Sequence, residues 1–423
     1  MARYFKFFII IYLVLIFASI SGASAEETLT WQGCIKEAAR NHPDLVSAKE
    51  AINQSEAAKS ITKSTLFPQV SADLRASETK TSGSKSVKDY TYGASATQLV
   101  FDGVKTINNV KAASETIKAS QQAYRFTSSQ VRLRLRTAFV NLLRAQELIK
   151  VTDDIIKIRR GNFELITLRY QSGLEHKGAL LTAEANLSEA LFEMAQAKRD
   201  LELAQKQMTK EMGRKEFTPM SVKSDFTVVD SAQVKPDFEI IIKNHPSLQQ
   251  IIDQENAARL SLKSVYGNFY PTISGSAGVD KIDSRWAPQN NQWSLGLAAS
   301  VPIFEGGLRF AEVSQAKAQL NQLIASERST KDGIIVGLEQ AWVNLQDAIE
   351  TVGVQAKQLA ATEERAKIAE AQYSIGTLTY DNWTIIEDNL VSAKRAYLNT
   401  QTNALITEAN WIQAKGEVLE YAQ

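Results

Sequence analysis

The spacing of apolar residues changes twice along the first half of the chain, and each change predicts a new secondary structure. Between positions 32 and 66 the apolar residues recur with a helical period. Pro68 stops this expected helix, because proline lacks a backbone donor and pushes Phe67 out of helical geometry. From Gln69 onward apolar and polar residues alternate, which predicts strands with two unlike faces. The helical period then returns, so we expect helix, β-hairpin and helix in that order.

The alternating segments predict two β-hairpins, at residues 69–102 and 272–304. Each segment is about ten residues long, the length that a tilted strand needs to cross a bilayer. One face is rich in Ser, Thr and Gly, which suits a water-filled lumen, and the other is apolar. A soluble four-stranded sheet packed on helices would alternate in the same way and is the alternative interpretation. The residues expected to face lipid are Tyr90, Tyr92, Trp293, Leu295 and Leu297.

Long helices are expected after each hairpin. Residues 104–170 contain no proline and one glycine, Gly161, so an unbroken helix there would extend ~100 Å at about 1.5 Å per residue. Gly173 and Gly376 are expected to end the two long helices, because glycine tolerates the left-handed backbone that follows a last turn. Return helices should then run to about Gly213 and about Ala422. The apolar stripes expected to be buried are Leu135, Phe139, Leu142 and Leu143, and Leu338, Trp342 and Leu345.

The second half of the chain repeats the first half. Asn41-His42-Pro43 recurs as Asn244-His245-Pro246, which is an offset of 203 residues. The same ungapped offset relates Phe101 to Phe304 and Gly173 to Gly376. A constant offset over this length predicts two copies of one structural unit. We therefore expect repeats at residues 26–213 and 236–423, joined by a linker at 214–235.

The first 25 residues have the pattern of a secretory signal peptide. Arg3 and Lys6 precede an apolar run at 7–20, and Ala23-Ser24-Ala25 supplies small residues for cleavage. Removing residues 1–25 leaves 46 of the 48 Lys+Arg against 47 Asp+Glu, so no polyanion-binding patch and no nucleic-acid partner are expected. The remaining chain lacks an apolar run of about 18 residues, so any membrane span must be made by strands.

No motif in the sequence indicates catalysis, a metal or a cofactor. Cys34 is the single cysteine, which excludes internal disulfides and multi-cysteine zinc sites, and the residues before it do not suit a lipid anchor. His42 and His245 occupy the same place in both repeats, each before a proline, so we interpret them as helix-boundary residues. Glycine-rich phosphate loops and nucleophile elbows are missing. The sequence therefore predicts a protein that is not an enzyme.

Four strands per chain cannot close a barrel, and open strand edges cannot face lipid. The barrel must then be shared between subunits. The chain resembles the TolC-type outer-membrane efflux protein family through Leu66-Phe67-Pro68, the residues Ser300-Val301-Pro302-Ile303-Phe304-Glu305-Gly306-Gly307, and Tyr373-Ser374-Ile375-Gly376-Thr377. The resemblance implies an α+β fold and a homotrimer whose barrel has about twelve strands, continued by a long antiparallel α-helical periplasmic tunnel.

The resemblance also implies partners and a location. It predicts an exit duct in the cell outer membrane for a tripartite efflux or type I secretion system, without a cofactor. The partners would be outer-membrane lipid, a periplasmic adaptor (membrane fusion) protein and an inner-membrane transporter. Two other classes stay open: a periplasmic coiled-coil interaction protein, which needs no amphipathic strands, and a barrel-anchored surface adhesin, which needs a long passenger domain. Drug, metal and protein cargo all stay open as well.

By the same resemblance, the two helix-to-helix turns form a periplasmic tip that meets the adaptor. Ordinary turn chemistry would also explain the two glycines. The family often carries acidic residues just past each turn, whereas this chain has Gly178-Ala179 and Asn382 there, and Leu378 replaces a basic partner. The expected tip residues are Arg169, Tyr170, Gly173, Leu174, Tyr373, Gly376, Thr377 and Leu378. The candidates for a charged aperture are Lys177, Asp381, Asn382, Glu387 and Asp388.

Overall fold

The computed structural model describes residues 27–224 and 234–419, so the expected signal peptide lies outside the described residues. The chain divides into two compact units. Within the described residues, unit 1 consists of 27–43, 128–224, 234–236 and 338–419, and unit 2 consists of 44–127 and 237–337. Both units therefore draw on both halves of the sequence. Among the described helices, none combines the length and apolar character that a membrane span requires.

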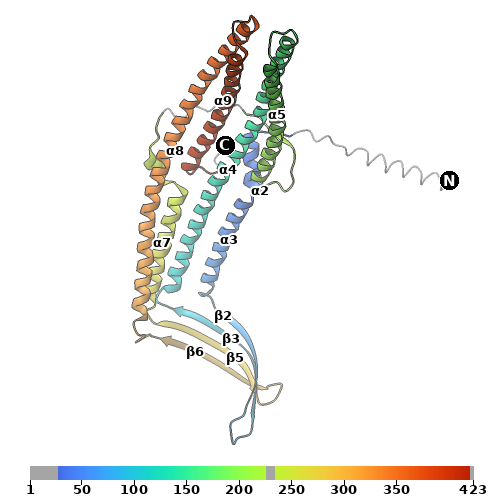
Figure 1. Cartoon of the computed structure of the whole chain (residues 1–423). Helices are drawn as coiled ribbons and strands as arrows, with labels where there is room; N and C mark the ends of the chain where they lie inside the picture. The colour runs from blue at the N-terminus through green and yellow to red at the C-terminus, as the bar shows by residue number, and fades with distance from the viewer. Residues whose placement is uncertain (1–26, 225–233, 420–423) are drawn as a thin grey trace, which may run out of the picture. The chain divides into compact units, whose positions relative to one another are not determined.

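Unit 2 contains the expected strands as one antiparallel sheet (Figure 1). Its strands are β2 (Gln69–Thr79), β3 (Val87–Phe101), β5 (Thr272–Asp283) and β6 (Asn290–Ser300). They lie in the order β2-β3-β5-β6, which leaves β2 and β6 as edges. The expectation that the second hairpin extends to 304 was wrong, since β6 ends at Ser300. Pro302 has no backbone N–H to donate to a neighbouring strand, which explains the early end.

The helix expected over residues 32–66 is two helices. α2 (Trp31–Asn41) and α3 (Pro43–Ser64) are separated at His42, whose backbone is extended at φ −65° and ψ 124°. Pro43 causes this break, because proline disfavours helical geometry in the residue before it. His245 has the same extended backbone between α6 (Phe238–Lys243) and α7 (Pro246–Gly267). Both histidines are therefore boundary residues, as the sequence predicts.

In the first repeat, both ends of the long helix lie within one residue of the predicted range 104–170. α4 (Lys105–Gln171) and α8 (Leu308–Ser374) have 67 residues each, and the return helices α5 (Lys177–Glu211) and α9 (Tyr380–Ala414) have 35 each. α9 ends well before Ala422, which lies outside the described residues. Gly416 follows α9 at φ 75°, just as Gly213 follows α5 at φ 75°, so a left-handed glycine ends both return helices.

The core of unit 1 lies between these helices. The predicted apolar stripes are confirmed, because Phe139 is 0% exposed and Trp342 is 4% exposed, and the other members are equally buried. α5 packs through alanines at every seventh position, whose small side chains allow close helix approach. These buried alanines are Ala183, Ala190, Ala197 and Ala204.

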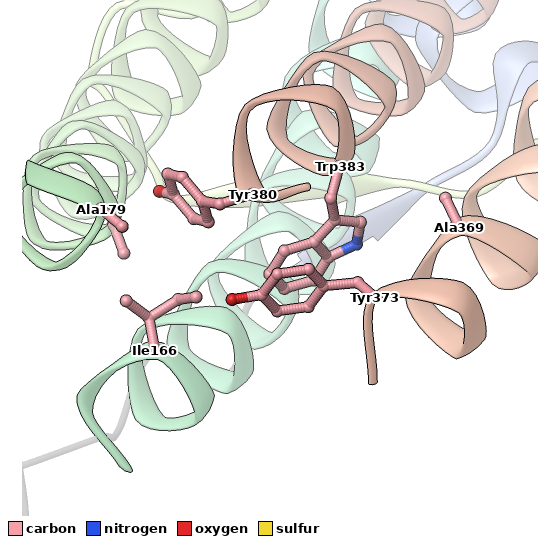
Figure 2. Packing of buried hydrophobic residues seen from close by; sticks show 7 residues of the cluster. Ile166, Ala179, Ala369, Tyr373, Tyr380 and Trp383 are labelled. Carbon is pink, nitrogen blue, oxygen red and sulfur yellow. The ribbon is translucent and has the colours of Figure 1, made fainter. Parts of the chain in front are cut away.

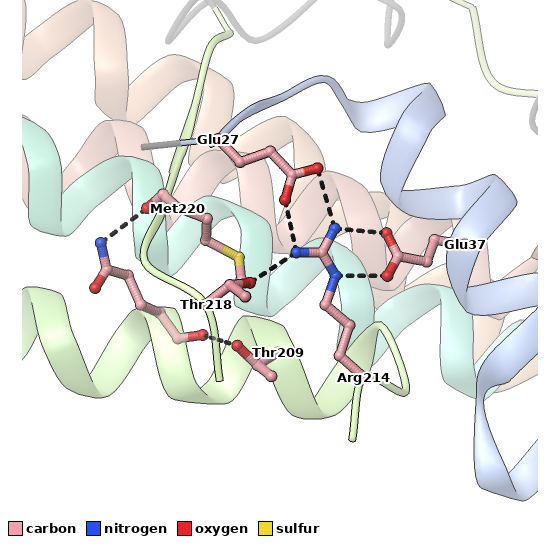
Figure 3. A network of polar contacts seen from close by, with 7 residues as sticks. Glu27, Glu37, Thr209, Arg214, Thr218 and Met220 are labelled. Carbon is pink, nitrogen blue, oxygen red and sulfur yellow. Dashed lines mark hydrogen bonds and ion pairs between the residues drawn. The ribbon is translucent and has the colours of Figure 1, made fainter. Parts of the chain in front are cut away.

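A short parallel strand pair in unit 1 was not predicted. β1 (Glu27–Leu29) pairs with β4 (Met220–Val222), which lies inside the segment expected to be a linker. Arg214 holds β1 in place (Figure 3). Its guanidinium donates to both oxygens of Glu37 at 2.5 and 2.8 Å and to both oxygens of Glu27 at 2.7 and 3.2 Å. A planar guanidinium can satisfy two carboxylates at once, which explains why arginine occupies this position.

Candidate functional site

The two helix-to-helix turns of unit 1 have the same backbone geometry. Gly173 has φ 75° and Gly376 has φ 77°, so both take the left-handed conformation that the sequence predicts. After α4, the N–H of Leu174 donates to the Arg169 carbonyl at 2.8 Å. After α8, the N–H of Thr377 donates to the Gln372 carbonyl at 2.9 Å. These bonds satisfy carbonyls that a helix end otherwise leaves open, and they make each turn rigid.

An aromatic cluster, the tip cluster, lies beneath these turns (Figure 2). Tyr373 and Trp383 stack with ring centroids 4.4 Å apart and an interplanar angle of 10°. Tyr380 meets both rings edge-on at 6.4 Å. Tyr373 and Trp383 are each 1% exposed. The tip cluster consists of Ile166, Ala179, Ala183, Ala369, Tyr373, Tyr380 and Trp383.

Tyr373 links the two turns to each other. Its hydroxyl donates to Glu175 Oε1 at 2.9 Å, and Glu175 belongs to the turn between α4 and α5. The Arg169 guanidinium lies 4.7 Å from the centre of the Tyr373 ring. Burial and the Glu175 carboxylate both raise the pKa of Tyr373, so the phenol stays protonated and keeps donating at neutral pH. Tyr373 is therefore an interior residue that fixes the turns, rather than part of their exposed surface.

The exposed part of the tip is formed by other predicted residues. Leu174 is 67% exposed and Tyr170 is 39% exposed, while Leu378 is half-buried against the tip cluster. Added side-chain atoms at Gly173 or Gly376 would meet open space. Within the described residues, Arg169 Nε and Trp383 Nε1 are buried without a hydrogen-bond acceptor.

The candidate aperture residues divide into two groups. Lys177, Asp381 and Asn382 are exposed. Glu387 is 5% exposed, and burial is the main cause that raises its pKa, with Glu370 adding to the effect. Asp388 accepts a bond from Arg159 of α4 at 2.5 Å. Asp388 therefore ties α9 to α4, and Glu387 is an interior carboxylate.

The strand register places the predicted lipid-facing residues on one face of the sheet. Neighbours across strands share a face, and Trp293 pairs with Val279 while Leu295 pairs with Ala277. Tyr92 likewise pairs with Leu74. Trp293 and Leu295 are each 78% exposed, so this part of the apolar face is uncovered, while Trp286 meets the Tyr90 ring edge-on at 5.9 Å. Leu297 and Tyr90 have the same parity as these residues along β6 and β3.

The opposite face of the sheet is polar. Ser71 and Ser95 pair across β2 and β3 with their hydroxyl oxygens 3.0 Å apart, and Gly278 and Ser294 continue the row across β5 and β6. Gly93 also lies on this face, where an added Cβ would come 2.0 Å from an oxygen of Asp280. The sheet thus has one apolar and one polar face.

Sequence reasoning missed three residues that organise the tip. Glu175, Trp383 and Arg159 each make a contact that joins separate helices. One signal was available for Trp383, because Tyr380 and Trp383 are three residues apart and therefore share a helix face. Glu175 and Arg159 carry no such signal, since a charge near a helix end usually faces solvent.

The comparisons with known proteins agree with this architecture. Residues 34–214 and 239–417 match the outer membrane efflux protein family. The chain belongs to this family. Its relatives include outer membrane efflux protein BepC of Brucella suis, 22% identical over 94% of this chain and 87% of the relative. Outer membrane protein TolC of Escherichia coli is 23% identical over 96% of this chain and 86% of TolC.

Solved structures of outer-membrane channels have the same fold. CusC superimposes with a TM-score of 0.81 at 17% identity, covering 93% of this chain and 95% of CusC. The open-state MtrE channel of Neisseria gonorrhoeae gives a TM-score of 0.80 at 18% identity, covering 92% and 89%. This outer membrane efflux protein is therefore TolC-like, with an α+β fold and a location in the outer membrane with a periplasmic extension. The family consists of efflux channels and not of enzymes.

Proposed function

We propose that the chain forms a homotrimeric exit duct that receives cargo from a periplasmic adaptor and an inner-membrane transporter, in a tripartite efflux or type I secretion system. The trimer shares one barrel of about twelve strands, and the long helices form the periplasmic tunnel. The matched lengths of α4 with α8 and of α5 with α9 support two copies of one unit, at residues 26–213 and 236–423.

The sheet of unit 2 carries this proposal. It has an uncovered apolar face, a polar face and two open edges, β2 and β6. In lipid, each unpaired N–H or C=O group of an edge strand costs several kcal/mol. An edge strand therefore cannot face lipid without a hydrogen-bonded neighbour. Pairing β6 of one chain with β2 of the next satisfies both edges. The apolar face, with Tyr90, Tyr92, Trp293, Leu295 and Leu297, then faces lipid and the serine-rich face lines the pore.

The two turns of unit 1 are the proposed adaptor contact. Leu174, Tyr170 and Thr377 offer exposed groups on rigid backbones. Gly173 and Gly376 keep side-chain atoms out of the way of an approaching hairpin. A surface that is already ordered before binding loses less conformational entropy on docking than a disordered loop does, which favours these hydrogen-bonded turns as the contact.

The aperture is proposed to be held by side-chain contacts that join separate helices and turns. Tyr373 with Glu175, and Arg159 with Asp388, join helices that would have to separate if the tunnel widened. Lys177, Asp381 and Asn382 are exposed near the same turns and are proposed to line the opening.

The test is the oligomeric state in a membrane, combined with export. The full chain is expressed in cells that lack their own outer membrane efflux protein, extracted in detergent and weighed by native mass measurement. We expect a trimer in the outer-membrane fraction that restores export when an adaptor and transporter are supplied. A folded monomer inserted in bilayers would exclude the shared barrel.

The same experiment separates the other two classes. A coiled-coil interaction protein would be found in the periplasmic fraction. That function would also leave the apolar face of the sheet without a role. A surface adhesin would need a long outward segment, whereas the hairpin connections span only 80–86 and 284–289 in the described residues.

A further inference from the structure

Three helices of unit 1 border a groove of about 620 Å³. α4 lines it between Lys157 and Leu165, α8 between Glu363 and Glu370, and α9 between Glu387 and Lys394. The lining residues of each helix are spaced three or four apart over about two turns, so the groove runs along the helix axes. A groove of this form accepts the ridge of another helix.

Glu387 is the residue in this groove whose bonding is incomplete. Glu387 is only 5% exposed, and its carboxylate oxygen Oε2 has no hydrogen-bond partner among the described residues. Asn162 lies close enough to stabilise the charged carboxylate, but Arg159 is engaged by Asp388. A buried acceptor without a donor destabilises the folded chain, and more strongly when it is charged. A donor that enters from the groove can therefore complete the bonding of Oε2.

The charges around the groove show what kind of donor fits. Each groove lysine already has a carboxylate: Lys157 pairs with Asp153 at 2.8 Å, Lys367 with Glu364 at 3.7 Å, and Lys394 with Glu363 at 3.4 Å. Glu370 and Glu387 line the groove without such a pair in the described residues. The groove thus holds two acidic groups, on α8 and α9, that have no ion-pair partner among the described residues, and an anionic partner is disfavoured.

We propose that this groove docks a helix of a partner protein, which inserts a lysine or arginine side chain between Glu387 and Glu370. This inference rests on the proposed function, in which a periplasmic protein meets these helices. A long basic side chain can lay its aliphatic stem on Ile158, Leu165 and Leu390 while its charged end reaches Glu387. The charge-assisted bond then supplies the missing donor. The groove is a second contact along the helices, separate from the turns.

The experiment places a photocrosslinker in the groove of the full chain in cells. Gly161 lines the groove and an added side chain there meets open space, so p-benzoylphenylalanine is introduced at Gly161. Gly353 on α8 also faces open space and serves as the matched position outside the groove. We expect an adduct from Gly161 whose crosslinked peptide is helical and contains lysine or arginine.

Charge variants then test the pairing. Glu387→Gln and Glu370→Gln should each lower the Gly161 adduct by about tenfold, which corresponds to about 1.4 kcal/mol, because each removes one partner of a charge-assisted bond. Glu350→Gln, which removes an exposed carboxylate of α8 outside the groove, should leave the adduct unchanged. Changing the partner's basic residue to glutamate should abolish the adduct, and Glu387→Arg should restore it. Outer-membrane abundance of each variant is measured to exclude misfolding.

Several outcomes overturn the proposal. An adduct that survives Glu387→Gln, or a crosslinked peptide without a basic residue, rejects the pairing. Adducts formed only with a second copy of the chain assign the groove to the subunit interface. Glu387-dependent binding of spermidine to the purified protein, with no Gly161 adduct, assigns it to small organic cations. A second crosslinker at Gly376 separates the two proposals. An adduct at Gly376 without one at Gly161 rejects only the docking of a helix in the groove. The absence of an adduct at both positions rejects the proposed function.

Discussion

The hydroxyl of Tyr373 donates to Glu175 at 2.9 Å, which joins the end of α8 to the turn between α4 and α5. The two residues are 198 positions apart in the sequence. Because the ring of Tyr373 also stacks on Trp383, one side chain connects three separate segments of unit 1. The turns are thus held by an interior contact that can be removed without altering their surface.

Tyr373→Phe removes this bond and keeps the stack. We expect a loss of about 1.5–3 kcal/mol in the free energy of unfolding, since Glu175 is a charged acceptor. Amide hydrogen exchange should accelerate at residues 172–180 and 375–379. Tyr170→Phe, at an exposed tyrosine, is the control and should change neither quantity. Unchanged exchange in Tyr373→Phe would mean that the turns are held by backbone bonds alone.

The apolar face of the sheet can be tested with lysine. Leu295→Lys should reduce membrane insertion by roughly 2 to 4 kcal/mol if it lies near the bilayer midplane. Ser294→Lys, one residue away on the polar face, should be tolerated. The readout is the amount of oligomer in the outer-membrane fraction. Equal effects of the two lysines would show that the faces are assigned wrongly.

Gly173→Val and Gly376→Val test the turns as a contact. A β-branched residue at positive φ is strained by about 1–2 kcal/mol, and its side chain enters the open space beside each turn. We expect normal trimer levels with weaker adaptor crosslinking and export, and a stronger effect in the double variant. Gly173→Asn and Gly376→Asn are controls for strain, because asparagine tolerates this backbone. Full export by the double valine variant would place the contact elsewhere.

Glu387 should make stability depend on pH in a defined direction. Burial raises its pKa, so the folded chain holds this proton more tightly than the unfolded chain. The contribution of protonated Glu387 to the free energy of unfolding is fully present below the ordinary glutamate pKa of about 4.3. This contribution is lost as the pH rises through the pKa of the folded chain. Glu387→Gln should remove this loss. Thermal unfolding of wild type and variant across that window should converge at low pH and separate at high pH, and parallel curves would contradict the assignment.

Arg214→Lys tests the clamp on β1. A single ammonium cannot span Glu37 and Glu27, so we expect a loss of about 1–3 kcal/mol, mostly from the better-buried Glu37. Faster proteolysis near Leu29 should accompany the loss. Arg328→Lys, at a side chain that is 87% exposed, is the control. If both variants unfold alike, β1 is held by its pairing with β4 alone.

The sequence predicts the helices and strands well wherever one periodicity continues for many residues. The start of α4 was placed within one residue because no proline and one glycine interrupt it. The single helix expected over 32–66 was wrong because the apolar pattern continues through His42, although Pro43 correctly marks His42 as a helix boundary. β1 and β4 have three residues each, and their pairing depends on Arg214, whose partners are distant in sequence.

The site was harder to predict than the fold. The turn glycines follow from local backbone chemistry, and their positive φ angles confirm that part. Tyr373 looks like a surface residue in the sequence because it sits at a helix end, yet the return helix places Trp383 against its ring. The buried position of Glu387 depends in the same way on which helices surround α9. Packing between distant segments cannot be deduced from a charge or an aromatic ring alone.

In the proposed shared barrel, the open edges of the four-stranded sheet would also set the kinetics of assembly. A chain that reaches the membrane alone has no partner for the backbone groups of β2 and β6. Strand insertion must therefore wait for an encounter with other chains, so its rate should rise more steeply than the first power of chain concentration. At low expression the waiting chains expose unpaired strands that invite aggregation. Cells that make little of this protein would then depend most strongly on chaperones that shield it during transit.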